Sequence, residues 1–438
     1  MPLLIVIGGI LLLFLLIARF KLNAFIAFIV VSLGVGLAEG MELERLVSAI
    51  ETGIGNTLGF LLIILGLGAM LGKLVADSGA AQRITTRLVS RFGKKNVQWA
   101  VVLTGFIVGI PMFYTVGFVI LVPLVFTVAA TTGLPLLYVG MPMLASLSVT
   151  HGYLPPHPAP TAISEIFQAD LGKTLLYGIL IAIPAIVVAG PLLSRTFTRI
   201  PASPLAEFVN PKVLSEDEMP GTGISVFTAL LPVILIGLAT LSEFLLPEGL
   251  WVRSALSFVG NPVIAMLLSV LVAIYTLGLA RGKDMKEIMQ SVADSVSGIT
   301  MVLLIIAGAG ALKQVLIDSG VSEYIGGLMA ASRISPLILA WGIATVIRVC
   351  VGSATVAGLT AAGIVLPLIG SSGVAPELMV LAIGSGSLML SHVNDSGFWL
   401  FKEYFNLTIS DTLRTWTLME TTVGIMGLLG VLTLNAIL

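Results

Sequence analysis

Charged side chains are scarce in this sequence of 438 residues: they make up 10% of it, against 57% hydrophobic residues. Soluble domains carry about 25% charged residues. From Val97 to Ser164 there is no acidic residue, lysine or arginine at all. The apolar residues form blocks of roughly 16 to 22, the length of a helix that crosses about 30 Å of hydrocarbon. A soluble core could not bury so many blocks, so we expect an all-α integral membrane protein in a lipid bilayer.

Other chemical groups are also rare. The single cysteine, Cys350, excludes an intramolecular disulfide and a cysteine-based metal site. The three histidines have no carboxylate cluster beside them, and no serine, histidine and aspartate are spaced for catalysis. We therefore expect no metal, no cofactor and no enzyme activity. The phosphate-binding motif G-x-x-x-x-G-K-[ST] is missing, which argues against ATP-driven pumping, and a net charge of −1 gives no reason to expect a nucleic acid partner.

Residues 1–23 are expected to form a first membrane helix and a turn. Arg19 and Lys21 follow the apolar block, and no basic residue precedes it. This order favours a retained helix with its N-terminus outside over a cleaved signal peptide. Both termini are predicted to be periplasmic.

Short motifs recur along the chain with a constant offset. Asp77-Ser78-Gly79 returns as Asp318-Ser319-Gly320, and Thr150-His151 returns as Ser391-His392. The offset is 241 residues in both cases, from 77 to 318 and from 151 to 392. We interpret this as an internal repeat. It consists of residues 24–193 and 261–438, separated by a cytoplasmic loop (194–223) and a linking membrane helix (224–260).

The charges of equivalent loops indicate that the two copies are inverted. The stretch after Gly79 carries five basic residues and no acid, as a cytoplasmic loop does: Arg83, Arg87, Arg91, Lys94 and Lys95. The equivalent stretch after Gly320 holds only Glu323 and Arg333. The linkers that precede the two motifs show the opposite bias: Glu42, Glu44, Arg45 and Glu51 in the first copy, and Arg281, Lys283, Asp284, Lys286 and Glu287 in the second.

Two apolar stretches, 98–131 and 335–370, are too long for one span and are interrupted centrally by Gly, Pro and Thr. We expect each to be a re-entrant hairpin, which leaves five spanning helices per copy. Inversion requires an odd number of spans in each copy. Two full spans in each stretch would also give an odd number, so this requirement does not distinguish hairpins from full spans. The broken centres favour hairpins, because irregular backbone at membrane depth survives only where it lines a cavity.

Two further segments, 136–170 and 376–403, are expected to be broken helices. Four prolines between His151 and Thr161 cannot remain in an α-helix. The equivalent segment from Ser391 to Gly397 is polar between apolar helices. Broken helices at equivalent places in inverted repeats indicate a binding site near the middle of the membrane.

Arg348 is the strongest single indication of that site, since it lies 13 residues beyond Ser335 in an otherwise apolar stretch. Burying this charge costs at least about 2.5–3.5 kcal/mol, so it should face a partner or a cavity. One interpretation is a buried ion pair with Asp395. The other is a clamp on an anionic substrate, because a guanidinium can bind a carboxylate through two hydrogen bonds. Both could hold in different states of a transport cycle.

Polar residues near these breaks complete the predicted site. The expected substrate contacts besides Arg348 are Ser353, Thr355, Tyr114, Thr115, His151, Thr161 and Asn394. Asp395 is the first candidate for a proton carrier, because a buried carboxyl can take up and release a proton; the alternative is that it only caps a helix. His392 and His157 are further candidates, since histidine titrates near neutral pH.

Three stretches carry a resemblance to a known family: V-T-H-G-Y-L-P-P-H-P-A-P-T from Val149, G-S-A-T from Gly352, and S-H-V-N-D-S-G-F-W-L-F-K-E-Y-F-N from Ser391. They resemble the gluconate permease family, and the similarity covers essentially the whole chain. Ser396 and Ala159 depart from the family pattern, which has Pro and Gly there.

The resemblance implies uptake of sugar acids with protons across the bacterial inner membrane. It also implies kinship to elevator-type transporters that work as homodimers. We therefore expect a gluconate–proton symporter that works by alternating access. Relatives carry idonate, fructuronate or D-serine, so another small organic anion or D-serine is the alternative cargo. A membrane-embedded enzyme and an anion channel are the rival classes.

Overall fold

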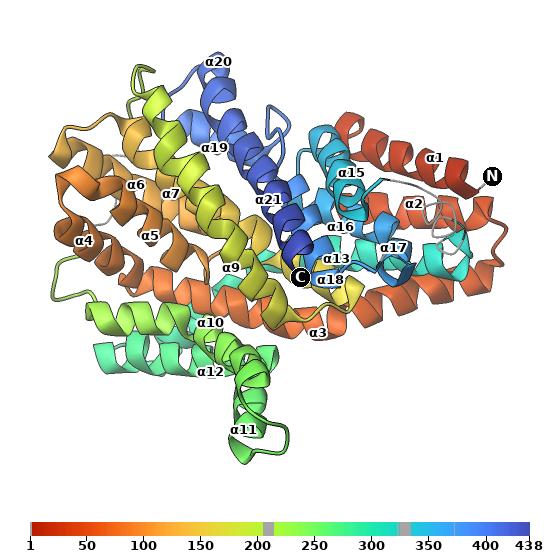
Figure 1. Cartoon of the computed structure of the whole chain (residues 1–438), viewed down its shortest axis with the longest axis horizontal. Helices are drawn as coiled ribbons and strands as arrows, with labels where there is room; N and C mark the ends of the chain where they lie inside the picture. The colour runs from red at the N-terminus through yellow and green to blue at the C-terminus, as the bar shows by residue number, and fades with distance from the viewer. Residues whose placement is uncertain (1, 205–213, 322–323, 325–333, 372) are drawn as a thin grey trace.

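The computed structural model describes residues 2–204, 214–321, 324, 334–371 and 373–438, and these residues form helices and no strands (Figure 1). The first half contains α1 (Pro2–Phe14), α2 (Ala24–Ala38), α3 (Leu43–Asp77), α4 (Ala80–Phe92), α5 (Val97–Gly109), α6 (Tyr114–Thr132), α7 (Leu136–Tyr153), α8 (Pro158–Phe167) and α9 (Leu171–Val187). The second half contains α10 (Thr222–Leu245), α11 (Trp251–Val259), α12 (Pro262–Ala273), α13 (Met285–Asp318), α15 (Pro336–Val351), α16 (Ala354–Val365), α17 (Pro367–Ser371), α18 (Pro376–Gly386), α19 (Ser396–Tyr404), α20 (Ile409–Thr412) and α21 (Leu418–Ile437).

Among the described residues, seven helices are long and apolar enough to cross a membrane. They are Leu43–Asp77, Tyr114–Thr132, Leu171–Phe197, Thr222–Leu245, Pro262–Arg281, Met285–Asp318 and Ile409–Ile437. Several of them continue an α-helix through a short π-helical piece, such as Leu413–Thr417 before α21. The prediction of an all-helical, multi-pass membrane protein is confirmed.

The two longest helices, α3 and α13, pack against each other along the molecule. Their backbones touch: a Cβ atom added to Gly53 would lie only 2.4 Å from the carbonyl oxygen of Gly310. Both helices begin earlier than expected, because residues predicted to lie in linkers form their first turns. Asp284 and Glu287 build a reciprocal capping box at the start of α13, which explains why acidic residues stand there.

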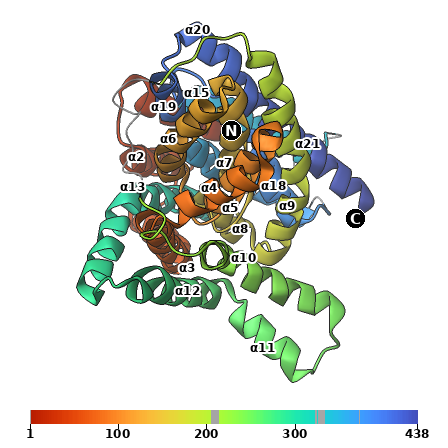
Figure 2. The same ribbon diagram turned by 90° about the vertical axis from the view of Figure 1, so that its left-hand side faces the viewer.

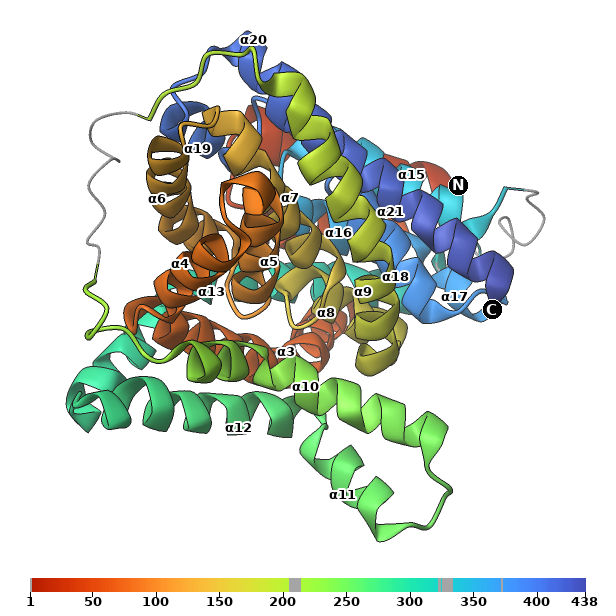
Figure 3. The ribbon, with the colours of Figure 1, turned by 60° about the vertical axis from the view of Figure 1, so that its left-hand side comes forward.

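Helices α10, α11 and α12 form a separate layer on the far side of α3 from the rest of the molecule (Figure 3). α10 packs on α12 and also on α4 and α9, whereas α11 projects away from the other helices and has no buried residue. Large apolar side chains remain exposed on this layer, among them Phe244, Leu245, Trp251 and Phe258. This layer therefore presents an apolar surface suited to lipid or another protein chain.

Helix breaks occur inside all four predicted irregular segments. Residues 110–113 separate α5 from α6, and Gly352 and Ser353 separate α15 from α16. Residues 154–157 separate α7 from α8, and residues 387–395 separate α18 from α19. The arms of the first hairpin are unequal, since α6 has 19 residues and reaches spanning length whereas α5 has 13. Re-entry of the hairpins and the number of five spanning helices per copy stay predictions.

Three of the four halves of the broken helices, α7, α8 and α18, pack against one another near the middle of the helix array (Figure 2). α7 and α18 are in direct backbone contact, because a Cβ atom on Gly384 would lie 2.2 Å from the carbonyl oxygen of Gly152. α9 and α21 pack against each other and against α7 and α18. The unwound residues 154–157 and 387–395 are thus held by close helix packing.

The repeated motifs share one local geometry. α3 ends at Asp77 and α13 ends at Asp318, and Gly79 and Gly320 both follow with a φ of 76°. Glycine suits this left-handed conformation, which lets the chain turn directly after each helix. The stretch that carries Glu323 and Arg333 lies outside the described residues, as does Lys212 of the loop between the copies.

Candidate anion-binding cavity

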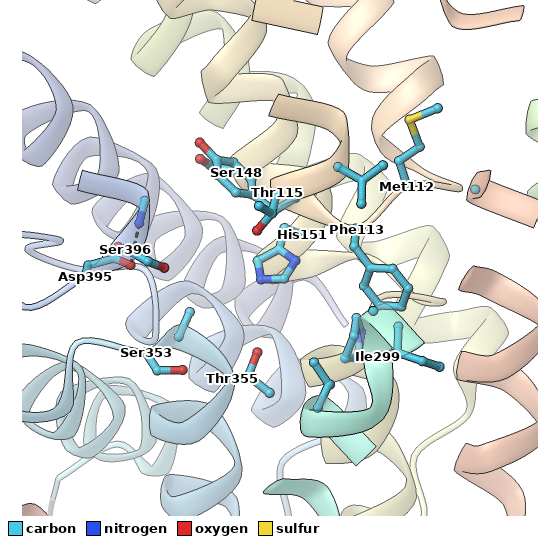
Figure 4. A pocket seen from close by; sticks show the side chains of 18 of the residues that line it. Met112, Phe113, Thr115, Ser148, His151, Ile299, Ser353, Thr355, Asp395 and Ser396 are labelled. Carbon is cyan, nitrogen blue, oxygen red and sulfur yellow. Dashed lines mark hydrogen bonds between the residues drawn. The ribbon is translucent and has the colours of Figure 1, made fainter. Parts of the chain in front are cut away.

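A cavity of about 490 Å³ lies where the hairpin tips and the broken helices converge. Its wall combines the start of α6, the end of α7, the turn between α15 and α16, the start of α19 and the region where α21 begins. Figure 4 shows His151 pointing into the space between Thr115 and Ser148 above it and Ser353 and Thr355 below it. The volume is in the range of small-molecule sites.

Arg348 supplies the positive charge of this wall. It lies in the last turn of α15, and only 3% of the residue is exposed. Its Nη2 donates to Oδ2 of Asp395 at 2.5 Å. Its Nε and Nη1 are buried and have no hydrogen-bond partner among the described residues. A buried donor without a partner is costly, so the described residues leave two of the three guanidinium nitrogens unsatisfied.

Asp395 is both the ion-pair partner of Arg348 and a helix cap. Besides pairing with Arg348, it is the N-cap of α19 and accepts a hydrogen bond from the Gly397 amide at 2.9 Å. The Ser391 hydroxyl also donates to it, and this hydroxyl accepts a hydrogen bond from Trp416 Nε1 at 2.8 Å. The carboxylate is therefore held by several donors in a fixed position.

The turn between α15 and α16 is attached to the second broken helix. Gly352 has a φ of 81°, and a Cβ atom there would lie 2.3 Å from the carbonyl oxygen of Asn394. The Asn394 side chain donates to the Val349 carbonyl at 2.8 Å, and His392 Nε2 lies 3.1 Å from the same oxygen. Asn394 and His392 thus bind backbone carbonyls that the end of α15 leaves without helical partners.

The first copy contributes uncharged polar groups. Tyr114, Thr115 and His151 line the cavity, and the Tyr114 ring lies against His151 with the ring centroids 5.9 Å apart. His151 Nδ1 is buried with no hydrogen-bond partner in the described part of the chain. His157 is placed behind it, where its Nε2 lies 2.9 Å from the Gly109 carbonyl oxygen. The Thr161 hydroxyl is buried as well, but it does not line the cavity.

The structure therefore brings together most of the predicted site. The predicted substrate contacts that line the cavity are Arg348, Ser353, Thr355, Tyr114, Thr115 and His151. Thr161 and Asn394 lie outside its lining. Of the predicted proton carriers, Asp395 lines the cavity, whereas His392 and His157 do not.

Sequence reasoning missed Glu420, which also lines the cavity and is 3% exposed. It lies in the first turn of α21, and the Ser148 hydroxyl of α7 donates to its Oε1. A signal was present, because Glu420 is the one charged residue between Trp416 and Leu438. An acid inside a membrane segment marks a functional site by default. Ser148 and Trp416 were missed too.

The cavity adjoins a second, more open one of about 590 Å³, and Lys73 and Asp294 line both. This second cavity is formed by charged residues at the end of α3 and the start of α13. Asp77 is central there: Lys73 Nζ donates to it at 2.9 Å, and the Ser291 hydroxyl donates to it at 2.6 Å. The main cavity thus has a polar approach from the end of α3.

Helices long enough to span a membrane, packed around a cavity with a buried arginine, are typical of a membrane transport protein. The chain belongs to the GntP permease family, since the family described as "GntP family permease" matches residues 1–437. The family expectation from the sequence is confirmed, and the protein is a permease and not an enzyme.

Relatives of known name are similar over their whole length. A high-affinity gluconate transporter of Escherichia coli is 55% identical over 439 residues, covering 100% of both chains. The Gnt-II system L-idonate transporter of the same organism is 55% identical over 438 residues, again covering 100% of both. A gluconate permease of Bacillus subtilis is 50% identical and covers 100% of both.

Solved structures resemble the fold with low sequence identity. The YdaH transporter of Alcanivorax borkumensis has a TM-score of 0.67 at 18% identity, covering 94% of this chain and 97% of that chain. MtrF of Neisseria gonorrhoeae has a TM-score of 0.69 at 16% identity and covers 94% of each. At this identity the likeness concerns the fold alone.

Proposed function

We propose that this permease imports gluconate, or a closely related sugar acid, together with protons by alternating access. The names of the similar gluconate transporters and permeases support the substrate class. The L-idonate transporter is as similar as the gluconate transporter, so the proposal covers sugar acids that differ in configuration. Another small organic anion or D-serine is the less favoured cargo.

The observation that carries the proposal is that only one of the three guanidinium nitrogens of Arg348 has a hydrogen-bond partner among the described residues. Asp395 occupies Nη2, and Nε and Nη1 are buried without partners in the part of the chain that the structure describes. A carboxylate can accept two parallel hydrogen bonds from one guanidinium. A sugar acid placed there could accept a hydrogen bond from one of these nitrogens without displacing Asp395, and a parallel pair would include the second hydrogen of Nη2.

The rest of the cavity suits a polyhydroxylated chain. Ser353 and Thr355 stand at the start of α16, and Thr115 and His151 face them from the first copy. Hydroxyl and imidazole groups can both donate and accept hydrogen bonds. The positive end of α16 lies next to Arg348 and adds to the attraction for an anion.

We further propose the membrane arrangement that the sequence predicts: two inverted repeats, an elevator-type mechanism, a homodimer in the bacterial inner membrane and both termini in the periplasm. The basic residues of α4 support a cytoplasmic position for the end of α3. The charged cavity at that end would then connect the binding site with the cytoplasm. The exposed apolar side chains of α10 and α11 offer a surface for the second subunit.

Uptake by purified protein in proteoliposomes tests the function. Labelled gluconate is offered with an inward proton gradient, an inward sodium gradient or no gradient, and idonate, fructuronate and D-serine compete. We expect proton-driven accumulation that sugar acids inhibit best, with the cargo recovered unchanged. Equilibration without accumulation would indicate a channel. Failure to take up any sugar acid would refute the proposal.

A further inference from the structure

Glu420 is a buried carboxyl group with no cation paired to it. Within the part of the chain that the structure describes, its one hydrogen bond comes from the Ser148 hydroxyl, and no salt bridge includes it. It lies 3% exposed at the wall of the cavity. An isolated ionised carboxylate in such surroundings is strongly disfavoured, so the group is stable there when it carries a proton.

The other polar groups around Glu420 are engaged elsewhere or uncharged. Arg348 faces the cavity from α15, but its contact is with Asp395. From α7, the Tyr153 hydroxyl donates to the Val423 carbonyl at 2.5 Å, and His151 lines the cavity beside Ser148. Tyr114 faces it from α6. None of these neighbours neutralises Glu420 as a permanent counter-ion.

Asp395 is less suited to carry the proton, because its oxygens already accept from Arg348, Ser391 and the Gly397 amide. Protonation would weaken its ion pair and its role as the cap of α19. Asp395 and Glu420 are thus two carboxyl groups of the cavity wall in different surroundings, and the third, Asp294, lies where the second cavity adjoins. Asp395 is paired with a cation and held by several donors, whereas Glu420 accepts a single hydrogen bond from a described residue and can change its charge.

We propose that Glu420 is the residue that binds the transported proton, an inference that rests on the proposed symport. The proton joins a carboxylate oxygen of Glu420 when the site is exposed to the periplasm and leaves to water when it is exposed to the cytoplasm. Coupling to the cargo follows from charge. Lys73, the other cation of the cavity wall, is paired with Asp77. A substrate carboxylate and an ionised Glu420 would therefore add two anions to the Arg348–Asp395 pair, so the anion and the proton enter together.

The same charge count gives the stoichiometry. The loaded site holds the substrate anion with a neutral Glu420, and the empty returning site holds an ionised Glu420 in its place. The site therefore carries the same net charge when it crosses the membrane loaded and when it returns empty. One proton accompanies each sugar acid. Transport is expected to be electroneutral, so a gradient of one pH unit supports about tenfold accumulation and the membrane potential has no effect.

The test compares Glu420→Gln with Glu377→Gln in proteoliposomes. Glu377 is a matched control, because it is a buried acid (8% exposed) on α18 that accepts from the Asp170 amide and lies outside the cavity lining. With an inward gradient of one pH unit, wild type and Glu377→Gln should accumulate gluconate about tenfold. Glu420→Gln should only equilibrate it, yet should still exchange internal for external gluconate.

A second readout separates coupling from damage to the fold. Gluconate binding to wild type should weaken as pH rises, because the anion then competes with an ionised Glu420, whereas binding to Glu420→Gln should not depend on pH. Glu420→Asp keeps a carboxyl group, so gluconate binding to this variant should still weaken as pH rises. This variant tests the assignment even if Glu420→Gln does not fold.

The possible outcomes are distinct. Normal proton-driven accumulation by Glu420→Gln, or a wild-type accumulation that follows the membrane potential, would overturn the assignment of Glu420 and leave sugar acid transport standing. Wild-type protein that takes up no sugar acid would instead refute the proposed function on which the assignment rests.

Discussion

Arg348 and Asp395 form an ion pair in which Nη2 and Oδ2 are 2.5 Å apart, and their side chains are only 4% and 15% exposed. Each residue also faces the cavity. Asp395 therefore stabilises the buried guanidinium while leaving two of its nitrogens free. The pair provides a binding group for anions that remains partly neutralised when no substrate is bound.

Replacing Arg348 by lysine tests the role of the free nitrogens. The ammonium can keep a contact with Asp395 but cannot offer two parallel hydrogen bonds to a carboxylate. We expect gluconate to bind about 10- to 100-fold more weakly, a loss of about 1.4–2.8 kcal/mol, with normal insertion. Equilibrium binding to purified protein gives the value. Arg253→Lys on α11, far from the cavity, is the control; equal affinity of both variants would remove Arg348 from the site.

Two substitutions at Asp395 separate its contributions to stability. Alanine removes the cap of α19 and leaves Arg348 as an unpaired buried charge, a combination expected to cost about 3–5 kcal/mol. Asparagine retains a capping oxygen and a hydrogen bond to Arg348. Thermal unfolding in detergent should therefore show a clearly larger drop in Tm for Asp395→Ala than for Asp395→Asn. Equal drops would mean that the hydrogen bonds that asparagine retains do not stabilise the fold.

The turn at Gly352 should not tolerate a side chain. Gly352→Ala would force a Cβ atom against the Asn394 backbone at a φ of 81°, so we expect lower thermal stability and weaker gluconate binding. Gly363→Ala in α16 is the matched control, because nothing lies within 4 Å of the added atom and alanine favours a helix by up to about 1 kcal/mol. If both variants behave alike, the close approach at Gly352 has no importance.

The inverted arrangement can be tested by labelling single cysteines. Arg87 on α4 and Tyr324 after α13 are both exposed and follow the two repeated motifs. In a Cys350→Ser background, a membrane-impermeant maleimide should label Arg87→Cys only from the cytoplasm and Tyr324→Cys only from the periplasm. Labelling of both from the same side would contradict the inversion.

The positions of the helix breaks could be predicted because they have local causes. Pro155 and Pro156 cannot continue α7, whereas Pro158 and Pro160 lie in the first turn of α8, and Gly352 ends α15 with a positive φ. Arg348 could be predicted to face a cavity since a cation among apolar residues has few other solutions. These features need no knowledge of which helices pack together.

Other features depend on tertiary packing and could not be predicted in this way. Asn394 is predicted to contact the substrate and His392 to carry a proton. In the structure both side chains contact carbonyl oxygens at the end of α15, which the sequence does not bring near them. Glu420 faces the cavity only because α21 packs against α7 and α18. The early starts of α3 and α13 differ from the prediction because charged residues are typical of a loop, although acids near a helix N-terminus also stabilise it.

The attachment of the Gly352 turn to Asn394 and His392 has a consequence for the transport cycle. The end of α15 and the residues before α19 are joined by several hydrogen bonds and by the contact of Gly352 with the Asn394 backbone. They cannot separate without breaking these bonds, and the Arg348–Asp395 pair spans the same junction. Any movement that opens the cavity to one side of the membrane should therefore displace the end of α15 and the residues before α19 as one rigid unit. Arg348 and Asp395 would then keep the same positions relative to a bound substrate.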